Sequence, residues 1–194
     1  MCIRDRVYRA SDSVLTEVTG RPELRDPIAQ FDRPAPTNPA TLFATSSRFA
    51  VLQNINNPNN MGVIMRNAAA LGIDAVLLDP TCSDPLYRRA IRSSMGQVFA
   101  LPHARIGPLE ESLETLHDHD ILTVALTPSG STELADVAID PDQKVAVMLG
   151  AEGPGLTDGA MNAAHVRAKI SMSNEVDSLN VANAAAIAFY SIRR

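Results

Sequence analysis

The chain has 194 residues, a net charge of −5 and 45% hydrophobic residues, which fits one domain with a well-buried core. No apolar run approaches the roughly 20 residues that cross a bilayer, and the N-terminus lacks the pattern of a secretory signal, so we expect a cytoplasmic protein without membrane contact. Two cysteines exclude a disulfide framework, and we interpret His117 and His119 as a solvated helix end rather than a metal site.

Residues 1–38 differ in composition from the rest of the chain. Residues 21–40 are rich in proline and charged side chains, which is typical of an irregular linker. Residues 7–33 look like the tail of a preceding domain. We therefore predict an N-terminal segment over 1–38, followed by a single domain over 39–194.

Strands and helices alternate from residue 49 onward. Short apolar runs predict strands at 49–55, 75–79, 98–101, 121–126, 144–149 and 166–170. Helices are predicted at 61–71, 108–118, 157–164 and 179–191, with a short helix opening at Asp84 and Pro85. This alternation predicts an α/β fold with a mainly parallel sheet flanked by helices. Ligands bind beyond the carboxyl ends of such strands, so the informative loops follow Ile55, Leu149 and Ile170.

The first informative loop leads into the helix after the strand at 49–55. Pro58 builds a turn, and Asn60 can cap the helix through its side chain. Gly62 permits close backbone approach in the first turn, and Arg66 lies in the second. A helix N-terminus with a nearby arginine favours phosphate. An ordinary capped helix with a surface arginine fits the same pattern.

The second loop is the glycine-rich segment 150–156. Its three glycines allow the backbone to approach a ligand closely, Pro154 stiffens it, and Glu152 adds an acceptor side chain. The spacing matches neither the dinucleotide-binding fingerprint nor a P-loop. A plain glycine-rich connection is the alternative.

The third loop precedes the strongly apolar final helix. Polar residues fill 171–178, and Asp177 or Ser178 can cap the helix. Asn180 would then lie in the first turn, where an amide can hold a ligand or act as a cap. For Ser178 alone, an ordinary helix cap is the favoured interpretation.

The charge pattern does not decide whether the partner is a nucleic acid. The acidic net charge argues mildly against one, because binding to the phosphate backbone favours a positive surface. Arg88, Arg89 and Arg92 nevertheless form a basic cluster with only Asp84 as an acidic neighbour.

In this order, the three loops resemble the motifs of the SpoU/TrmH branch of the SPOUT methyltransferases, and the segment 88–102 resembles the family's stretch between the first two motifs. The resemblance covers about residues 49–192. It implies an S-adenosylmethionine-dependent enzyme that methylates a ribose 2′-hydroxyl of structured RNA, either rRNA or tRNA. It also implies a deep C-terminal trefoil knot. Many relatives carry an N-terminal substrate-binding domain, of which 1–38 would be a remnant plus linker.

The resemblance further implies a homodimer with each site near the subunit interface. The final helix, 179–191, and the first motif helix would contribute to the contact between subunits. No metal is implied.

The resemblance also assigns roles by motif matching. Arg66 would act at the 2′-hydroxyl, where we expect it to grip the neighbouring phosphate, because an arginine is effectively always protonated. Asn60 would hold Arg66 or the substrate, Glu152 would order the motif loops, and Ser178 and Asn180 would complete the catalytic set. The cofactor would be bound by Leu149, Gly150, Glu152, Gly153, Ile170, Met172, Ser178 and Leu179. RNA would contact Arg66, Arg88, Arg89 and Arg92.

Two rival functions remain at this point. A non-catalytic RNA-binding relative would have kept the fold and lost the reaction, but the retained Asn60, Arg66, Glu152, Ser178 and Asn180 argue against it. A doubly wound dehydrogenase would need the dinucleotide fingerprint after its first strand, and that fingerprint is missing.

Overall fold

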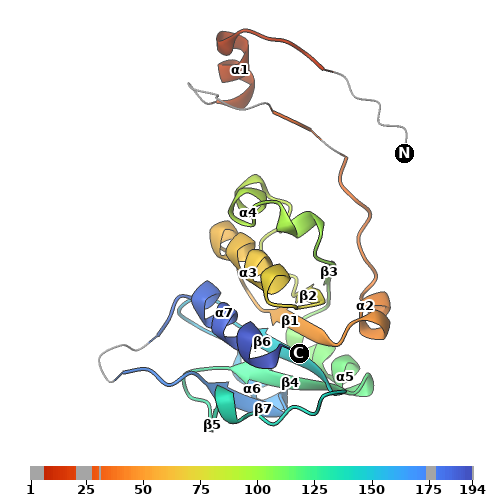
Figure 1. Cartoon of the computed structure of the whole chain (residues 1–194), viewed down its shortest axis with the longest axis vertical. Coiled ribbons are helices and arrows are strands. Elements are labelled where there is room, and N and C mark those ends of the chain that lie inside the picture. The colour runs from red at the N-terminus through yellow and green to blue at the C-terminus, as the bar shows by residue number, and fades with distance from the viewer. Residues whose placement is uncertain (1–6, 21–27, 31, 174–177, 194) are drawn as a thin grey trace. The chain divides into compact units, whose positions relative to one another are not determined.

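The computed structural model describes residues 7–20, 28–30, 32–173 and 178–193. The chain divides into two compact units, Met1–Ala35 and Pro36–Arg194. The first unit contains the helix α1 (Asp12–Thr19), which buries none of its residues. The remaining helices and strands belong to the second unit (Figure 1).

The second unit is built on a seven-stranded sheet whose strand order is β3-β2-β1-β6-β4-β7-β5. Its strands are β1 (Arg48–Leu52), β2 (Ala75–Leu78), β3 (His103–Arg105), β4 (Ile121–Leu126), β5 (Thr132–Glu133), β6 (Lys144–Leu149) and β7 (Val166–Lys169). All neighbouring strands among them pair in parallel. The central strands are continuous apolar runs because both of their faces are covered. The predicted parallel α/β fold is confirmed.

Helices cover both faces of the sheet (Figure 1). They are α2 (Pro39–Thr45), α3 (Pro58–Ala70), α4 (Arg88–Ser93), α5 (Leu109–Asp118), α6 (Asp158–Ala163) and α7 (Val181–Ile192), with 3-10 turns η1 (Gln97–Phe99) and η2 (Leu134–Asp136). Side chains alternate along each strand, so β1 sends Ala50 and Leu52 into the core under α3 and α7. Phe49 and Val51 of the same strand pack into the core under α2, α5 and α6.

One predicted strand is wrong. The apolar run 98–101 forms the end of η1 and a turn, and the strand lies further on, at β3. Val98 and Leu101 are buried whereas Phe99 is 61% exposed, so the apolar residues face the core three positions apart rather than two. Periodicity cannot separate these cases in so short a run.

Two helix starts also differ from the predictions. The short helix expected to open at Asp84 begins at Arg88, because the Asp84 carboxylate accepts a hydrogen bond from the Leu86 N–H (2.9 Å) in a turn that precedes it. The helix α2 lies where the proline-rich linker was predicted to end. Asn38 caps it and Pro39 occupies its first position, so proline starts this helix instead of breaking it.

Candidate functional site

The carboxyl ends of β1 and β6 bring the first two motif loops together. Leu52 pairs with Leu149 at the end of the two strands, and the Gln53 N–H donates to the Leu149 carbonyl (2.9 Å). The strands β4 and β7 end at the same edge of the sheet because all of these pairs are parallel. The third motif loop, which follows β7, therefore opens on the same side.

These loops enclose a cavity of about 170 Å³. All eight residues predicted to bind the cofactor line it: Leu149, Gly150, Glu152, Gly153, Ile170, Met172, Ser178 and Leu179. One wall of the cavity was not predicted from the sequence, and it is formed by Leu126 at the end of β4 and by Thr127 and Pro128 after it. Because β4 is itself a predicted strand of the parallel sheet, its carboxyl end was the signal that could have identified this wall.

The glycine-rich loop folds back on itself at the cavity. The Gly155 N–H donates to the Ala151 carbonyl (2.9 Å), and Gly155 has a φ of 73°, a conformation that favours glycine. A Cβ at Gly150 would lie 2.1 Å from the Gly155 carbonyl carbon, so no larger residue fits there without moving the backbone. The glycines thus make the turn that exposes backbone groups at the cavity.

A polar chain joins the three motifs. The Asn180 side chain donates to the Asn60 Oδ1 (3.2 Å), and Asn60 donates through Nδ2 to the Glu152 carboxylate (3.1 Å). These three residues lie far apart in the sequence. Asn60 and Glu152 meet because they follow β1 and β6, which are neighbouring strands of the sheet. Glu152 therefore has a fixed partner at the cavity wall.

The helix caps differ from those predicted, and they explain why the Asn60 and Asn180 side chains can form the polar chain with Glu152. Asn57 caps α3 by accepting from the Asn59 N–H (2.9 Å), so Asn60 lies inside the helix with its side chain free to reach Glu152. Asn180 itself caps α7 through its Oδ1, which accepts from the Ala182 N–H (2.9 Å). The prediction that Ser178 caps the helix is wrong, and Asp177 lies outside the described residues.

Arg66 stands apart from the other predicted catalytic residues. Asn60, Glu152 and Asn180 are joined by hydrogen bonds and Ser178 lines the cavity. Arg66 lies on the exposed side of α3 and does not line the cavity enclosed by the motif loops. Within one chain, four of the five residues predicted to be catalytic thus lie together at the motif loops, and Arg66 does not.

A network around Thr157 anchors the far end of the glycine-rich loop. The Thr157 N–H donates to the Gln53 Oε1 (2.9 Å), and the Gln53 amide donates back to the Thr157 hydroxyl (3.2 Å). That hydroxyl donates in turn to Glu110, which lowers the pKa of the Glu110 carboxyl. Gln53 is buried, so this pairing connects β1, α5 and the start of α6 beneath the loop.

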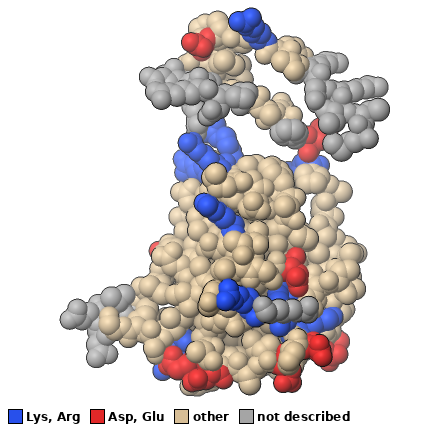
Figure 2. Space-filling view, viewed as in Figure 1, with Lys and Arg blue, Asp and Glu red and all other residues tan. Residues whose placement is uncertain are grey.

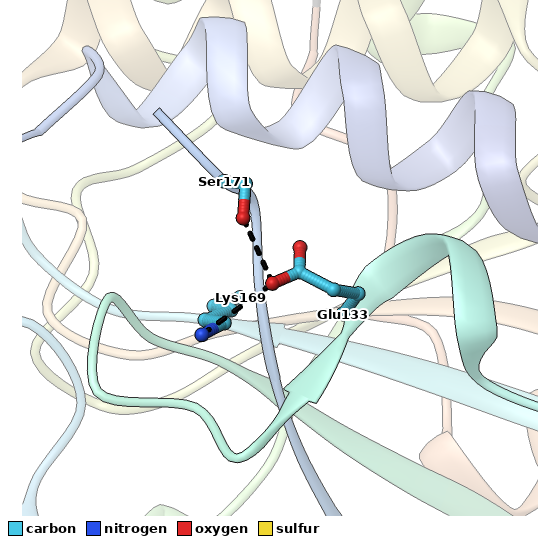
Figure 3. Close-up of polar contacts among 3 residues, drawn as sticks. All are labelled: Glu133, Lys169 and Ser171. Carbon is cyan, nitrogen blue, oxygen red and sulfur yellow. Dashed lines mark hydrogen bonds and ion pairs between the residues drawn. The ribbon is translucent and has the colours of Figure 1, made fainter. Parts of the chain in front are cut away.

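A second contact anchors the segment that follows β7. The Ser171 hydroxyl donates to the Glu133 Oε1 (2.8 Å), and the Lys169 Nζ lies 3.4 Å from the same oxygen (Figure 3). The hydrogen bond from Ser171, followed by the interaction with Lys169, lowers the pKa of the Glu133 carboxyl. Ser171 lies between Ile170 and Met172, so this contact holds two cavity residues against the edge strand β5.

A second cavity of about 270 Å³ adjoins the first. Ala151, Glu152 and Val181 line both cavities. The other walls come from the segment between β1 and α3, from Asn60 in the first turn of α3 and from Pro154. The two cavities together form a site with one largely apolar compartment and one compartment rich in amide side chains.

The predicted basic cluster is exposed on α4. Arg88, Arg89 and Arg92 are all exposed, and Tyr87 and Phe99 beside them are 51% and 61% exposed. On the face shown in Figure 2, basic side chains lie over α4, and the acidic side chains lie mainly at the opposite end of the same unit, where some basic ones are also present. The surface charge is therefore unevenly distributed.

Neither metal ligands nor a membrane span were found in the part of the chain that the structure describes. No group of three or more His, Cys, Asp or Glu residues there is placed to hold a metal ion. No helix there has both the length and the apolar character needed to cross a bilayer.

Comparison with known proteins relates this site to a methyltransferase family. The model of the SpoU rRNA Methylase family matches residues 47–190. A protein of Mycobacterium tuberculosis named as a tRNA/rRNA methyltransferase is 42% identical over 185 residues, which cover 94% of this chain and 64% of the relative. The 23S rRNA (guanosine-2′-O-)-methyltransferase of Xylella fastidiosa is 34% identical over 140 residues, covering 72% of this chain and 55% of that protein.

Solved structures agree with this relationship. The AdoMet-bound rRNA methyltransferase of Sinorhizobium meliloti superposes with a TM-score of 0.77 at 25% identity, covering 93% of this chain and 69% of that one. The SpoU methyltransferase AviRb of Streptomyces viridochromogenes, in complex with AdoMet, gives a TM-score of 0.68 at 26% identity, with coverage of 75% and 57%.

The predicted cofactor agrees with these two complexes. The chain spans 64% of the length of the mycobacterial relative. The family match nevertheless covers most of this chain and includes all three motifs. The chain therefore belongs to the SpoU rRNA methylase family.

Proposed function

We propose that this chain binds S-adenosylmethionine in the 170 Å³ cavity and transfers its methyl group to a ribose 2′-hydroxyl of rRNA or tRNA. The observation that carries the proposal is the convergence of three motif loops on one cavity. Hydrogen bonds join Asn180, Asn60 and Glu152 at the polar side of this cavity. The name of the Xylella relative, a guanosine-2′-O-methyltransferase, supports the ribose as the acceptor.

The composition of the cavity fits this cofactor. Leu149, Ile170, Met172 and Leu179 offer apolar walls for an adenine ring, and the glycine-rich loop offers backbone donors and acceptors for polar groups. When bound, S-adenosylmethionine supplies an electrophilic methyl group on a sulfonium. The protein then has to align the acceptor oxygen and allow its proton to leave.

The polar residues have separable tasks in this reaction. Glu152, held by Asn60, would keep the motif loops in order beside the acceptor. Arg66 would grip the phosphate next to the target ribose, because its planar guanidinium offers paired donors. The hydroxyl proton would leave to phosphate or water, since Arg66 is already protonated.

A homodimer would bring Arg66 to a site. Arg66 lies on the exposed side of α3, which packs against α7. On α7, Ile187 and Tyr190 are 42% and 55% exposed in the single chain. We propose that a second copy covers this face and that the two sites lie near the interface. The exposed apolar side chains and the separation of Arg66 from the cavity support this assembly.

The RNA would also contact α4. Three arginines beside two exposed aromatic rings combine phosphate-binding and base-stacking groups, a combination that suits unpaired RNA. This uneven charge reconciles an acidic net charge with an RNA substrate. The interpretation of residues 1–38 as a remnant of a substrate-binding domain and the cytoplasmic location stay predictions.

We also propose the deep trefoil knot. The strand order supports it. The strand β6 follows both β1 and β4 in the sequence but lies between them in the sheet, and the chain then continues to β7 and α7. Knotted chains are very rare, so a knot at the cofactor cavity would be a distinguishing feature of the fold.

Calorimetric titration with S-adenosylhomocysteine, with NAD as the control ligand, tests the proposal. We expect selective binding of S-adenosylhomocysteine, followed by 2′-O-methylation in a screen of unmodified rRNA and tRNA. A folded dimer that binds RNA but not S-adenosylhomocysteine would instead identify a non-catalytic RNA-binding relative. Selective binding of NAD would favour a dehydrogenase.

A further inference from the structure

A cavity lined by amide side chains adjoins the proposed cofactor cavity, and of its polar lining residues only Asn60 and Glu152 have a role in the proposed reaction. Four asparagines line it: Asn54, Asn56, Asn57 and Asn60. An asparagine amide presents a donor and an acceptor side by side, which suits the edge of a nucleobase.

Two of these amides are already engaged. The Asn57 side chain caps α3, and the Asn60 side chain is bonded to both Glu152 and Asn180. Asn54 and Asn56 make no side-chain hydrogen bond to any described residue. They are therefore available to a ligand at the cavity wall.

The backbone at Asn54 is held in one unusual conformation. Its φ is 56°, in the left-handed region, and its N–H donates to the Asp79 carboxylate (3.2 Å). Asp79 is itself buried and is fixed by hydrogen bonds from Thr81 and from the Cys82 N–H. The position from which the Asn54 amide extends is thus set by groups beneath the cavity.

The arrangement of the two cavities relates them to one nucleotide. They share Ala151, Glu152 and Val181, so a ribose placed at the shared wall would have its base in the amide-lined cavity. No aromatic side chain lines that cavity among the described residues, which leaves hydrogen bonding to the base edge rather than stacking.

We propose that this cavity receives the base of the target nucleotide and that Asn54 and Asn56 read its edge, which makes the enzyme selective for one base. The inference rests on the proposed methyltransferase function and deepens it by naming the side chains that choose the nucleotide. One well-placed amide contact changes base discrimination by about tenfold or more.

The test uses the full chain and RNA transcripts. The nucleotide methylated by the wild type is first identified by nuclease digestion and mass spectrometry, and the target position is then transcribed as A, C, G or U. Asn54→Gly removes the amide while keeping a residue that accepts a positive φ. Asn54→Asp keeps the shape but replaces the donor by an acceptor. Asn59→Ala is the matched control, because Asn59 is a nearby exposed asparagine in the first turn of α3 that does not line the cavity.

We expect the wild type to prefer one base at least tenfold in kcat/KM and Asn54→Gly to reduce this preference about tenfold. Binding of S-adenosylhomocysteine should stay unchanged, and Asn59→Ala should behave as the wild type. Undiminished discrimination in both Asn54 variants, or equal methylation of all four bases by the wild type, would overturn the inference alone. Absence of a 2′-O-methyl product from every RNA would overturn the proposed function together with it.

Discussion

At the scale of single residues, side-chain partners separate the candidate catalytic groups from one another. Asn60, Glu152 and Asn180 hold each other in place, whereas Arg66 has no polar partner among the described residues. A residue without a partner in the free protein can be devoted to the substrate. Its substitution should therefore change catalysis more than stability.

Replacement of Arg66 by lysine tests this separation. The lysine keeps the charge but not the bidentate grip, so we expect kcat to fall at least about tenfold, the effect of about 1.4 kcal/mol on the barrier. The unfolding midpoint and the affinity for S-adenosylhomocysteine should stay unchanged. Undiminished turnover would show that a point charge suffices and would remove the phosphate-gripping role.

A histidine pair gives the fold a sensitivity to acid. The His117 and His165 rings lie 4.1 Å apart, and both contact the Thr123 hydroxyl. His165 also accepts the Thr123 N–H on Nδ1 (3.1 Å). His117 thus lies at the end of α5 as predicted but is only partly exposed to solvent, while His119 is exposed as expected.

Burial, followed by the proximity of His165, lowers the pKa of His117 below its ordinary 6.5. The unfolded chain therefore binds this proton at higher pH than the folded chain, and stability falls as the pH drops from 6.5 toward the lower folded pKa. Urea midpoints at pH 7.5 and 5.5 should differ less in His117→Gln than in the wild type. An equal pH dependence in the two proteins would exclude His117 as the source.

At the scale of elements, short contacts between loops hold the cavity walls. The bond between Ser171 and Glu133 is the clearest example, because it ties the segment after β7 to the edge strand β5 (Figure 3). We expect Ser171→Ala to weaken binding of S-adenosylhomocysteine severalfold, because the segment that carries Ile170 and Met172 loses its hydrogen bond to Glu133. Ser173→Ala, a nearby exposed serine, is the control for calorimetry, and equal losses in both variants would contradict the contact's role.

The same contact has a defined pH dependence. The pKa of Glu133 is lowered in the folded chain, so its contribution is complete above the ordinary value of 4.5 and is lost as the pH falls through the folded pKa. Between neutral pH and 4.5 the contact should be constant, which separates its effect from that of His117.

At the scale of the whole molecule, the sequence predicted the layers but not their arrangement. Apolar runs such as 144–149 identify buried parallel strands, because burial on both faces leaves a continuous hydrophobic signal. The insertion of β6 between β1 and β4 is not visible in any local pattern, since it depends on pairing between distant segments. The two-residue strand β5 is too short to show a periodicity.

The candidate site was predicted to a similar extent. The strand ends and the glycines indicated where the cavity lies. The eight residues that the family resemblance assigned to the cofactor all line this cavity. The helix caps were missed because several asparagines compete for the same role within 56–60, and only the chain path decides between them. In the proposed dimer Arg66 would meet a site through the contact between two copies, and such a contact is not visible in the local sequence pattern.

The proposed dimer is tested by a charge on the exposed face of α7. We expect Ile187→Glu to shift the protein from dimer to monomer in sedimentation velocity and to reduce methyl transfer, because Arg66 would no longer reach a site. Thr115→Glu places the same charge on α5, at the other face of the sheet, and should stay dimeric. A wild type that is monomeric at all concentrations would exclude the assembly.

The pairing of β1 with β6 also determines the order of events during synthesis. Arg48 pairs with Val145, so β1 leaves the ribosome long before its central partner exists. Until then the edge of β1, which is apolar from Phe49 to Leu52, is open to wrong partners, with only β2 available to pair with one side. Pairing over such a sequence separation slows folding. Expression at low temperature or with a chaperone that shields nascent strands should therefore raise the yield of native protein, even though β1 is buried along its whole length in the finished sheet.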